Sequence, residues 1–382
     1  MDVAVIGGGI VGLASAYSLA TDGHAVTVYE MGSLGNGSTE RSAGGIRRQF
    51  STPVNVELSK ASLAVWADFA DEFGVDIDFR RPGYLFLARR KSTANSLKNA
   101  AKMQRAHDVP TEILDPESAR EHCPGLRSER FSRATYLSTD GFADPHLALQ
   151  GYAERARELG VDVLTNTAVT DIVRRHGRVE AVEVEGTRQQ VDYVVNAAGP
   201  WARRVAAMAD LSLPVAPKRR QVLVVEPERA VPETVPLTID LDTGSYFRPE
   251  REGDALVGGH FAESDPDEDP DRYSESVGLE YTLTALEQAA DVASYFGPES
   301  GRKRAWAGLY AVTPDDHPIL EESAPGLISA VGFSGHGFQH APATGALVAE
   351  LITEGAASVV DISGLERDRF ESGDSIGETY VA

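Results

Sequence analysis

The chain has 382 residues, enough for about two domains, and its 36 basic against 58 acidic residues give a net charge of −22, which argues against nucleic acid or an anionic membrane as a partner. Its one cysteine, Cys123, excludes an intrachain disulfide and a metal site built from several cysteines, and we expect no metal. No stretch reaches the roughly 18 apolar residues of a membrane span, and no leader precedes the first predicted strand, so we expect a cytoplasmic protein.

An apolar strand opens the chain and runs into a glycine-rich turn and a helix. In the pattern Gly-x-Gly-x-x-Gly, Gly7 permits a tight turn and Gly9 lets the backbone approach a pyrophosphate. Gly12 lets the helix pack closely on the strand. The pattern therefore predicts dinucleotide binding, and the alternative is a glycine turn that only packs.

Two further features place this turn in a nucleotide-binding setting. The free N–H groups of Ile10 and Val11 lie at the start of the helix, where the helix dipole favours phosphate. A second strand, residues 25–29, ends on Glu30, where a carboxylate accepts hydrogen bonds from an adenosine ribose. Strand, turn, helix, second strand and acidic residue are thus in register.

Beyond this unit, periodicity and turn residues predict alternating helices and strands, with no internal repeat. Helices are expected over residues 54–73, 95–106, 116–122, 146–159, 280–295 and 343–354, and strands over 83–88, 161–164, 172–184 (a hairpin), 191–195, 222–225, 245–248, 255–258 and 326–331.

The order of these elements predicts a mixed α/β (α+β) fold in which one domain interrupts another. Residues 1–80, 139–215 and 300–382 are expected to form a Rossmann-like dinucleotide-binding domain. Residues 81–138 and 216–299 are expected to form a strand-rich substrate domain, inserted in two segments.

Acidic residues gather in two places late in the chain. The run Glu263–Asp271 has a calcium-like composition, but its two prolines and its spacing favour a solvated loop. The last twenty residues are polar and acidic and are expected to be loosely packed.

The composition of the whole chain, with six lysines against thirty arginines and many carboxylates, suggests a halophilic protein that stays hydrated in high salt. A merely acidic protein from a GC-rich genome is the alternative.

Five signatures follow one another along nearly the whole chain. They are Gly7–Gly12 with Glu30, Ser42–Arg47, Val194–Ala202, Trp306–Tyr310 with Thr313–Asp315, and Gly332–Phe338. In this order they resemble the FAD-dependent amine and amino-acid oxidoreductase superfamily, which includes D-amino acid oxidase, glycine oxidase and sarcosine oxidase. The resemblance is closest to the branch of the sarcosine oxidase β-subunit and dimethylglycine dehydrogenase. It implies that the dinucleotide is FAD.

The resemblance also implies which residues surround the cofactor. In the C-terminal signature, Gly335 and Gly337 let the backbone lie against a flat ring, and the positive end of the following helix favours flavin reduction. The other residues expected to contact FAD are Ser38, Arg41, Ser42, Val169, Ala198, Gly199, Gly308, His336, Phe338 and Gln339.

Three departures from the superfamily pattern bear on how the flavin is attached, how a substrate carboxylate is bound and whether oxygen is the electron acceptor. Gly308 stands where monomeric sarcosine oxidase attaches its flavin to a cysteine, and no attachment histidine is clearly matched, so FAD is expected to be noncovalent. The carboxylate-binding arginine of glycine oxidase is replaced by Tyr310. The strand Ala255–Gly259 has no lysine to activate oxygen, which weakens the case for an oxidase.

Candidate substrate residues come from the same resemblance. Arg47 matches a carboxylate-binding arginine of the sarcosine oxidases, and guanidinium suits this role; a surface arginine is the alternative. Tyr246 matches a substrate-contacting tyrosine, and Arg248 shares its face of the strand. His336 and His260 are the histidines nearest the expected flavin, His260 being more often structural in such a position.

These features leave three functions open. The first is hydride transfer from a small amino or N-methylamino acid to flavin N5, which yields an imine. The second is oxidation of a 2-hydroxy acid, with His260 or His336 as the base. The third is an electron-transferring flavin subunit of a larger complex. The electron acceptor would be oxygen, a quinone or an electron-transfer protein, and a partner subunit is possible.

Overall fold

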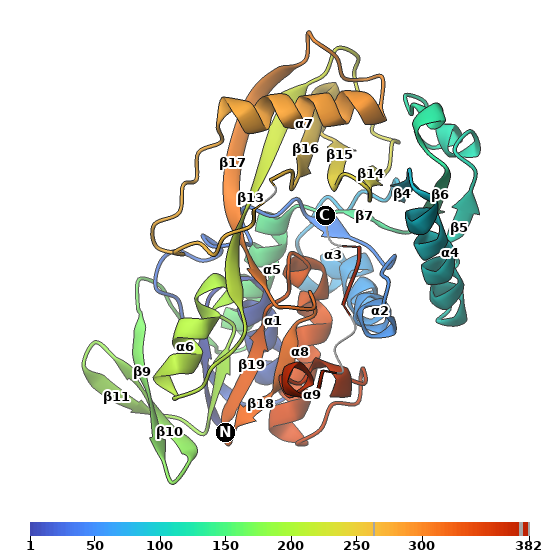
Figure 1. Ribbon diagram of the computed structural model, residues 1–382. Coiled ribbons are helices and arrows are strands. Elements are labelled where there is room, and N and C mark those ends of the chain that lie inside the picture. Colours follow the sequence, from blue (N-terminus) through green and yellow to red (C-terminus); the bar gives the residue numbers. More distant parts are fainter. Residues whose placement is uncertain (263, 374–376, 381–382) are drawn as a thin grey trace.

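The computed structural model describes residues 1–262, 264–373 and 377–380, and shows a mixed α/β fold built on two large sheets (Figure 1). The first sheet has six strands, all parallel except the edge strand β18. In spatial order they are β18 (Ile319–Ala324), β19 (Leu327–Val331), β12 (Tyr193–Asn196), β1 (Asp2–Ile6), β2 (Ala25–Tyr29) and β8 (Asp162–Leu164).

Alternating side chains of β1 give this sheet two buried faces. Val3 and Val5 join a core with the helices of one face, and Ala4 and Ile6 join a second core on the other face. The first face carries α1 (Ile10–Thr21), α2 (Pro53–Ala67), α3 (Phe69–Phe73), α5 (Pro145–Glu158) and α8 (Gly337–Thr353), and the second carries α6 (Ala202–Met208) and the small sheet of β9 (Val169–Arg175), β10 (Arg178–Val184) and β11 (Thr187–Gln190).

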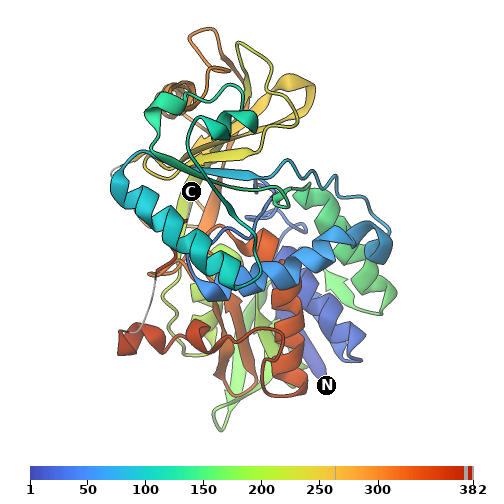
Figure 2. The same cartoon turned by 90° about the vertical axis from the view of Figure 1, so that its right-hand side faces the viewer.

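The second large sheet has eight strands and lies above the first in the view of Figure 1. Helix α7 (Leu279–Val292) packs across it, and α4 (Lys91–Ala106) packs beside β4 and β6 (Figure 2). The strands, in spatial order, are β17 (Gly301–Val312), β13 (Ala216–Glu226), β16 (Ala255–Gly259), β15 (Ser245–Pro249), β14 (Leu237–Asp240), β4 (Tyr84–Ala88), β6 (Arg133–Leu137) and β5 (Glu112–Leu114). Strand β17 begins just after residue 300, where the second segment of the substrate domain is expected to end. It pairs over its full length with β13, which precedes that boundary.

Two local predictions are wrong in detail, and one strand, β11, was not predicted. The helix expected over 116–122 is a 3-10 turn, Ser118–Glu121. The last long helix, α8, starts at Gly337 rather than near residue 343, because Pro342 lies inside the helix and does not mark its start. Strand β11 has an exposed polar sequence with no hydrophobic alternation to announce it.

The described part of the C-terminal end packs against the body, contrary to the expectation of loose packing. Arg369 in α9 (Arg369–Ser372) is buried and paired with Asp315. Glu378 and Tyr380 are also buried, and the Glu378 carboxylate accepts hydrogen bonds from Ser51.

A short pair of strands, β3 (Gly45–Ile46) and β7 (Gly141–Phe142), completes the fold. None of the helices in the described ranges has the length and apolar character needed to cross a bilayer.

Candidate active site

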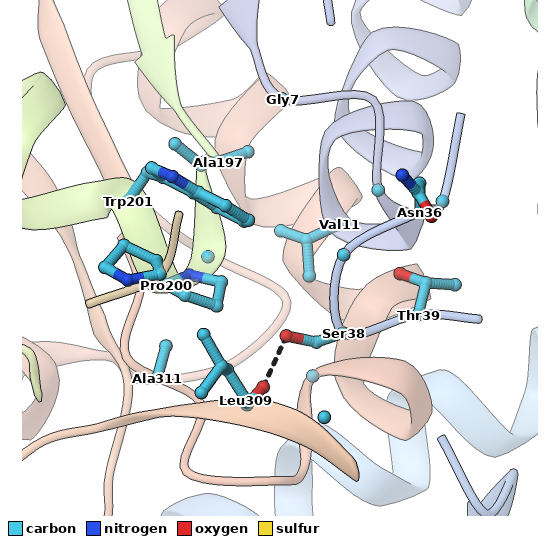
Figure 3. A pocket seen from close by; sticks show the side chains of 18 of the residues that line it. Gly7, Val11, Asn36, Ser38, Thr39, Ala197, Pro200, Trp201, Leu309 and Ala311 are labelled. Carbon is cyan, nitrogen blue, oxygen red and sulfur yellow. Dashed lines mark hydrogen bonds between the residues drawn. The ribbon is translucent and has the colours of Figure 1, made fainter. Parts of the chain in front are cut away.

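A cavity of about 570 Å³ runs from the carboxyl ends of β1 and β2 to the face of the eight-stranded sheet. This edge of a parallel sheet is where ligands bind in doubly wound folds. Figure 3 shows Trp201 and Ala197 on one side of the cavity and Val11, Ser38 and Thr39 on the other.

The three glycines of the N-terminal turn have the geometry that a nucleotide site needs. Gly7 has a φ of +113°, and a Cβ there would lie 2.5 Å from the carbonyl oxygen of Ala197. A Cβ on Gly12 would lie 1.9 Å from the carbonyl oxygen of Gly7, so this residue serves helix packing and does not line the cavity. Gly9 is the N-cap of α1 and lines the cavity, and a Cβ there would lie 3.3 Å from the Thr39 hydroxyl.

Glu30 is fixed at the end of β2 by backbone amides. Its two carboxylate oxygens accept hydrogen bonds from Gly8 N at 2.8 Å and Gly32 N at 2.7 Å. The N–H of Ile10, at the start of α1, is not free as expected but donates to the Thr39 hydroxyl at 3.1 Å. Both side chains line the cavity, so a carboxylate and a helix N-terminus meet where a ribose and a phosphate would lie.

Most of the predicted FAD residues line this cavity. Ser38 donates to the Leu309 carbonyl at 2.6 Å, which ties the segment between β2 and β3 to β17 (Figure 3). Three of the predicted residues, Gly12, His336 and Gln339, do not line it. Those that do are Gly7, Gly9, Ile10, Val11, Glu30, Ser38, Arg41, Ser42, Val169, Ala198, Gly199, Gly308, Gly335, Gly337 and Phe338.

The N-terminus of α8 also faces the cavity. Gly335, with a φ of +93°, and Gly337 line it, and a Cβ on Gly335 would lie 2.3 Å from the ring of Tyr310. The positive end of this helix is therefore available to a flat, electron-accepting ring.

Arg47 lies behind the cavity wall rather than in it. Its guanidinium donates to the carbonyl oxygens of Gln49 and Tyr380, and lies 3.2 Å from His336 Nε2. It also stacks 3.9 Å from the Phe50 ring centroid. Burial lowers the pKa of Arg47, and the charge of Glu378 opposes this. The Arg47 guanidinium is therefore already hydrogen-bonded to carbonyl groups of the protein itself.

Tyr246 and Arg248 share a strand but not the same surroundings. Tyr246 lines the cavity; burial, followed by the neighbouring Tyr310, raises its pKa well above the usual value and keeps its hydroxyl protonated. Arg248 is buried away from the cavity, where it pairs with Glu250 at 3.0 Å and donates to the Ala43 carbonyl at 3.2 Å.

Neither candidate histidine lines the cavity. Burial, and then the charge of Arg47, hold the pKa of His336 well below its usual range, so the ring is neutral at pH 7. His260 lies beside the Arg220–Asp265 pair, its Nε2 3.9 Å from an Asp265 oxygen. Burial and the Arg220 charge lower the pKa of His260.

The acidic run, whose first residue Glu263 lies outside the described residues, is a loop with mostly exposed carboxylates, as expected, and several of these carboxylates pair with basic residues. Lys218 pairs with Asp267 at 2.9 Å, and Arg220 pairs with Asp265 at 2.8 Å. Arg204 pairs with Asp269 and with Asp271, and the latter carboxylate lines the cavity. Within the described residues no cluster of side chains suits a metal ion.

Sequence reasoning missed two cavity residues on the eight-stranded sheet. Arg220 and Tyr310 both line the cavity, with the guanidinium carbon 5.5 Å from the tyrosine ring centroid. The available signal was the run Lys218–Arg220, three basic residues on a strand of a very acidic chain.

A doubly wound sheet, a glycine turn at a helix N-terminus and a second helix N-terminus facing the same cavity define a dinucleotide-dependent redox protein. The chain belongs to the DAO family of FAD-dependent oxidoreductases, whose model matches residues 2–351. It is an FAD-dependent oxidoreductase of the amino-acid oxidase and dehydrogenase type.

Several relatives resemble it over nine-tenths or more of their own length. The solved L-proline dehydrogenase of P. horikoshii is 32% identical, with a TM-score of 0.88 over 97% of this chain and 98% of that one. Glycine oxidase of Geobacillus kaustophilus is 30% identical over 92% of both chains. Sarcosine oxidase subunit beta of Rhizobium meliloti is 28% identical over 99% of this chain and 90% of its own.

We expect acid or heat to release the FAD. Among the described residues no cysteine or histidine lines the cavity, and Cys123 is buried in the core under the eight-stranded sheet, so an attachment side chain is missing. The measurement is ultrafiltration of the denatured protein. Flavin that stays with the polypeptide would contradict noncovalent binding.

Proposed function

We propose that this protein oxidises the C–N bond of a small amino acid, and that a secondary or N-methylated amine, with L-proline first, is the preferred class. The similarity to L-proline dehydrogenase, glycine oxidase and sarcosine oxidase subunit beta supports this class.

One observation favours an amine over a 2-hydroxy acid. A hydroxy acid needs a base for its hydroxyl proton, whereas a neutral amine delivers hydride without one. In the described structure neither His260 nor His336 lines the cavity. At the sheet end Tyr246, Tyr310 and Arg220 line the cavity and can orient a substrate. The carboxylates Asp271 and Glu275 also line the cavity, but each is paired with an arginine.

Different residues of the cavity would bind the cofactor and the substrate. Bound FAD supplies the hydride acceptor. The turn at Gly7–Gly12 and the N-terminus of α1 would hold its pyrophosphate, and Glu30 its ribose. The protonated Tyr246 hydroxyl would donate a hydrogen bond to the substrate from the cavity wall.

The function can be tested by product analysis. The purified holoenzyme, supplied with a redox dye, should convert L-proline to a cyclic imine, or sarcosine to glycine and formaldehyde. Turnover of lactate or glycolate, with no amino acid oxidised, would transfer the assignment to the hydroxy-acid class.

We expect air to reoxidise the reduced enzyme more slowly than a quinone or dye does. None of the cavity-lining residues in the described chain is a lysine, and the Lys218 ammonium is paired with Asp267. A quinone or electron-transfer protein, or a partner subunit that carries electrons away, is therefore the proposed acceptor. Stopped-flow mixing of reduced enzyme with aerated buffer measures this; peroxide formation at the full turnover rate would contradict it.

A further inference from the structure

The face of the eight-stranded sheet that lines the cavity carries the side chain of Arg220 together with Tyr246 and Tyr310. Arg220 pairs across the ladder with Gly308, and Val222, two residues on, pairs with Gly258, which pairs with Tyr246. Directly opposite residues share a face of a sheet, so Arg220 and Tyr246 lie on the same side. Both line the cavity.

The Arg220 guanidinium already holds a carboxylate. Its Nη1 and Nη2 donate to the two Asp265 oxygens at 2.8 and 3.0 Å, and Nη1 also donates to the Arg219 carbonyl. This is the paired geometry in which guanidinium recognises a carboxylate. Asp265 thus occupies Arg220 as the carboxylate of an amino acid would.

The other arginines near the cavity are committed to different tasks. Arg41 donates to the carbonyls of Asn36 and Gly37 and pairs with Glu275. Arg204 pairs with the acidic loop. Arg47 and Arg248 do not line the cavity, and backbone carbonyls accept from both.

We propose that Arg220 binds the substrate carboxylate and that Asp265 is an internal competitor that the substrate displaces. This inference rests on the proposed function. The loop can release Asp265 and stay in place, because Lys218 holds Asp267 and Glu268 N donates to the Pro217 carbonyl at 2.9 Å. Since only the fraction of molecules with a free guanidinium can bind, the Asp265 pair lowers the apparent affinity for carboxylates.

The test is a titration of the FAD-loaded enzyme with pyrrole-2-carboxylate, a flat and unreactive analogue of proline, followed by the change in flavin absorbance. Asp265→Asn should bind it about 3- to 10-fold more tightly than the natural chain. Arg220→Lys should bind it about 10- to 100-fold more weakly, because an ammonium cannot form the paired hydrogen bonds.

Two controls isolate the charge contact. Asp267→Asn, in the same loop, should bind the analogue within about 2-fold of the natural chain, on the scale of an exposed ion pair. The neutral pyrrole-2-carboxamide should bind weakly and equally to all variants. Unchanged affinity in Arg220→Lys, or no gain in Asp265→Asn, would overturn the proposal.

Flavin reduction by L-proline separates this inference from the proposed function. If proline reduces the flavin but Arg220→Lys saturates as the natural chain does, only the carboxylate assignment fails. If the titration gives the expected order and no amino acid reduces the flavin, the proposed function fails and the carboxylate site stands.

Discussion

A Gly9→Val chain is expected to fold and to purify without its yellow cofactor. Gly9 is the N-cap of α1 with ordinary φ, and a Cβ added to it would lie 3.3 Å from the Thr39 hydroxyl, a tight contact that a shift of a few tenths of an ångström in this one side chain would relieve. The added methyl groups enter the space beside the pyrophosphate. Overpacking of this kind costs about 1–3 kcal/mol and occasionally more, so FAD affinity should fall by about 10- to 100-fold or further.

The measurement is FAD affinity by fluorescence titration, with circular dichroism as the check on folding. Gly278→Val is the matched control, because Gly278 is also a helix N-cap glycine but lies in open space at the start of α7. It should keep its FAD. Gly12→Val should instead disturb the turn itself, since its Cβ meets the Gly7 carbonyl oxygen. A Gly9→Val protein with natural FAD affinity would contradict the nucleotide site.

Arg369→Ala should cause the largest loss of stability, about 3–5 kcal/mol of unfolding free energy, which is typical of breaking a buried ion pair. Arg369 Nε and Nη2 donate to the two Asp315 oxygens at 2.7 and 3.1 Å, and both side chains are buried. The same guanidinium donates to the carbonyls of His317, Pro318 and Leu365. Its removal leaves a buried carboxylate and several acceptors without their donor.

The pH dependence of this contact follows from Asp315. Burial alone would raise the pKa of Asp315, but the hydrogen bond and charge of Arg369 outweigh it and lower the pKa. The stabilisation is therefore present above the unfolded pKa of about 3.9 and is lost as pH falls through the lower folded value.

Urea unfolding at neutral pH measures the effect of Arg369→Ala. Arg155→Ala is the control, because Arg155 forms an exposed pair with Glu158 that should contribute about 1 kcal/mol or less. A loss in Arg369→Ala no larger than in Arg155→Ala would show that the C-terminal end is not anchored through this pair.

The cofactor end of the site could be predicted from sequence because its determinants are local. The turn at Gly7–Gly12, the strand end at Glu30 and the glycines before α8 each act within a few residues of their own element. Their side chains or backbone therefore lie where the spacing indicates.

The substrate end depends on contacts between distant segments, which no local pattern contains. The Arg47 guanidinium is occupied by the Tyr380 carbonyl, from the far end of the chain, and His336 is buried against it. Arg220 enters the site only because β13 pairs with β16 and β17 in one sheet. The acidic loop binds to basic residues of β13 and α6 that precede it by many residues.

The salt tolerance that the acidic composition of the chain suggests stays a prediction.

Mixing the FAD-loaded enzyme with L-proline, sarcosine, glycine and the hydroxy acids lactate and glycolate under nitrogen tests the central claim most directly. We expect at least one amino acid, L-proline first, to bleach the flavin in a single turnover, and the hydroxy acids to leave it oxidised. A flavin that only the hydroxy acids bleach, or that none of these compounds bleaches, would contradict amino-acid oxidation at this site.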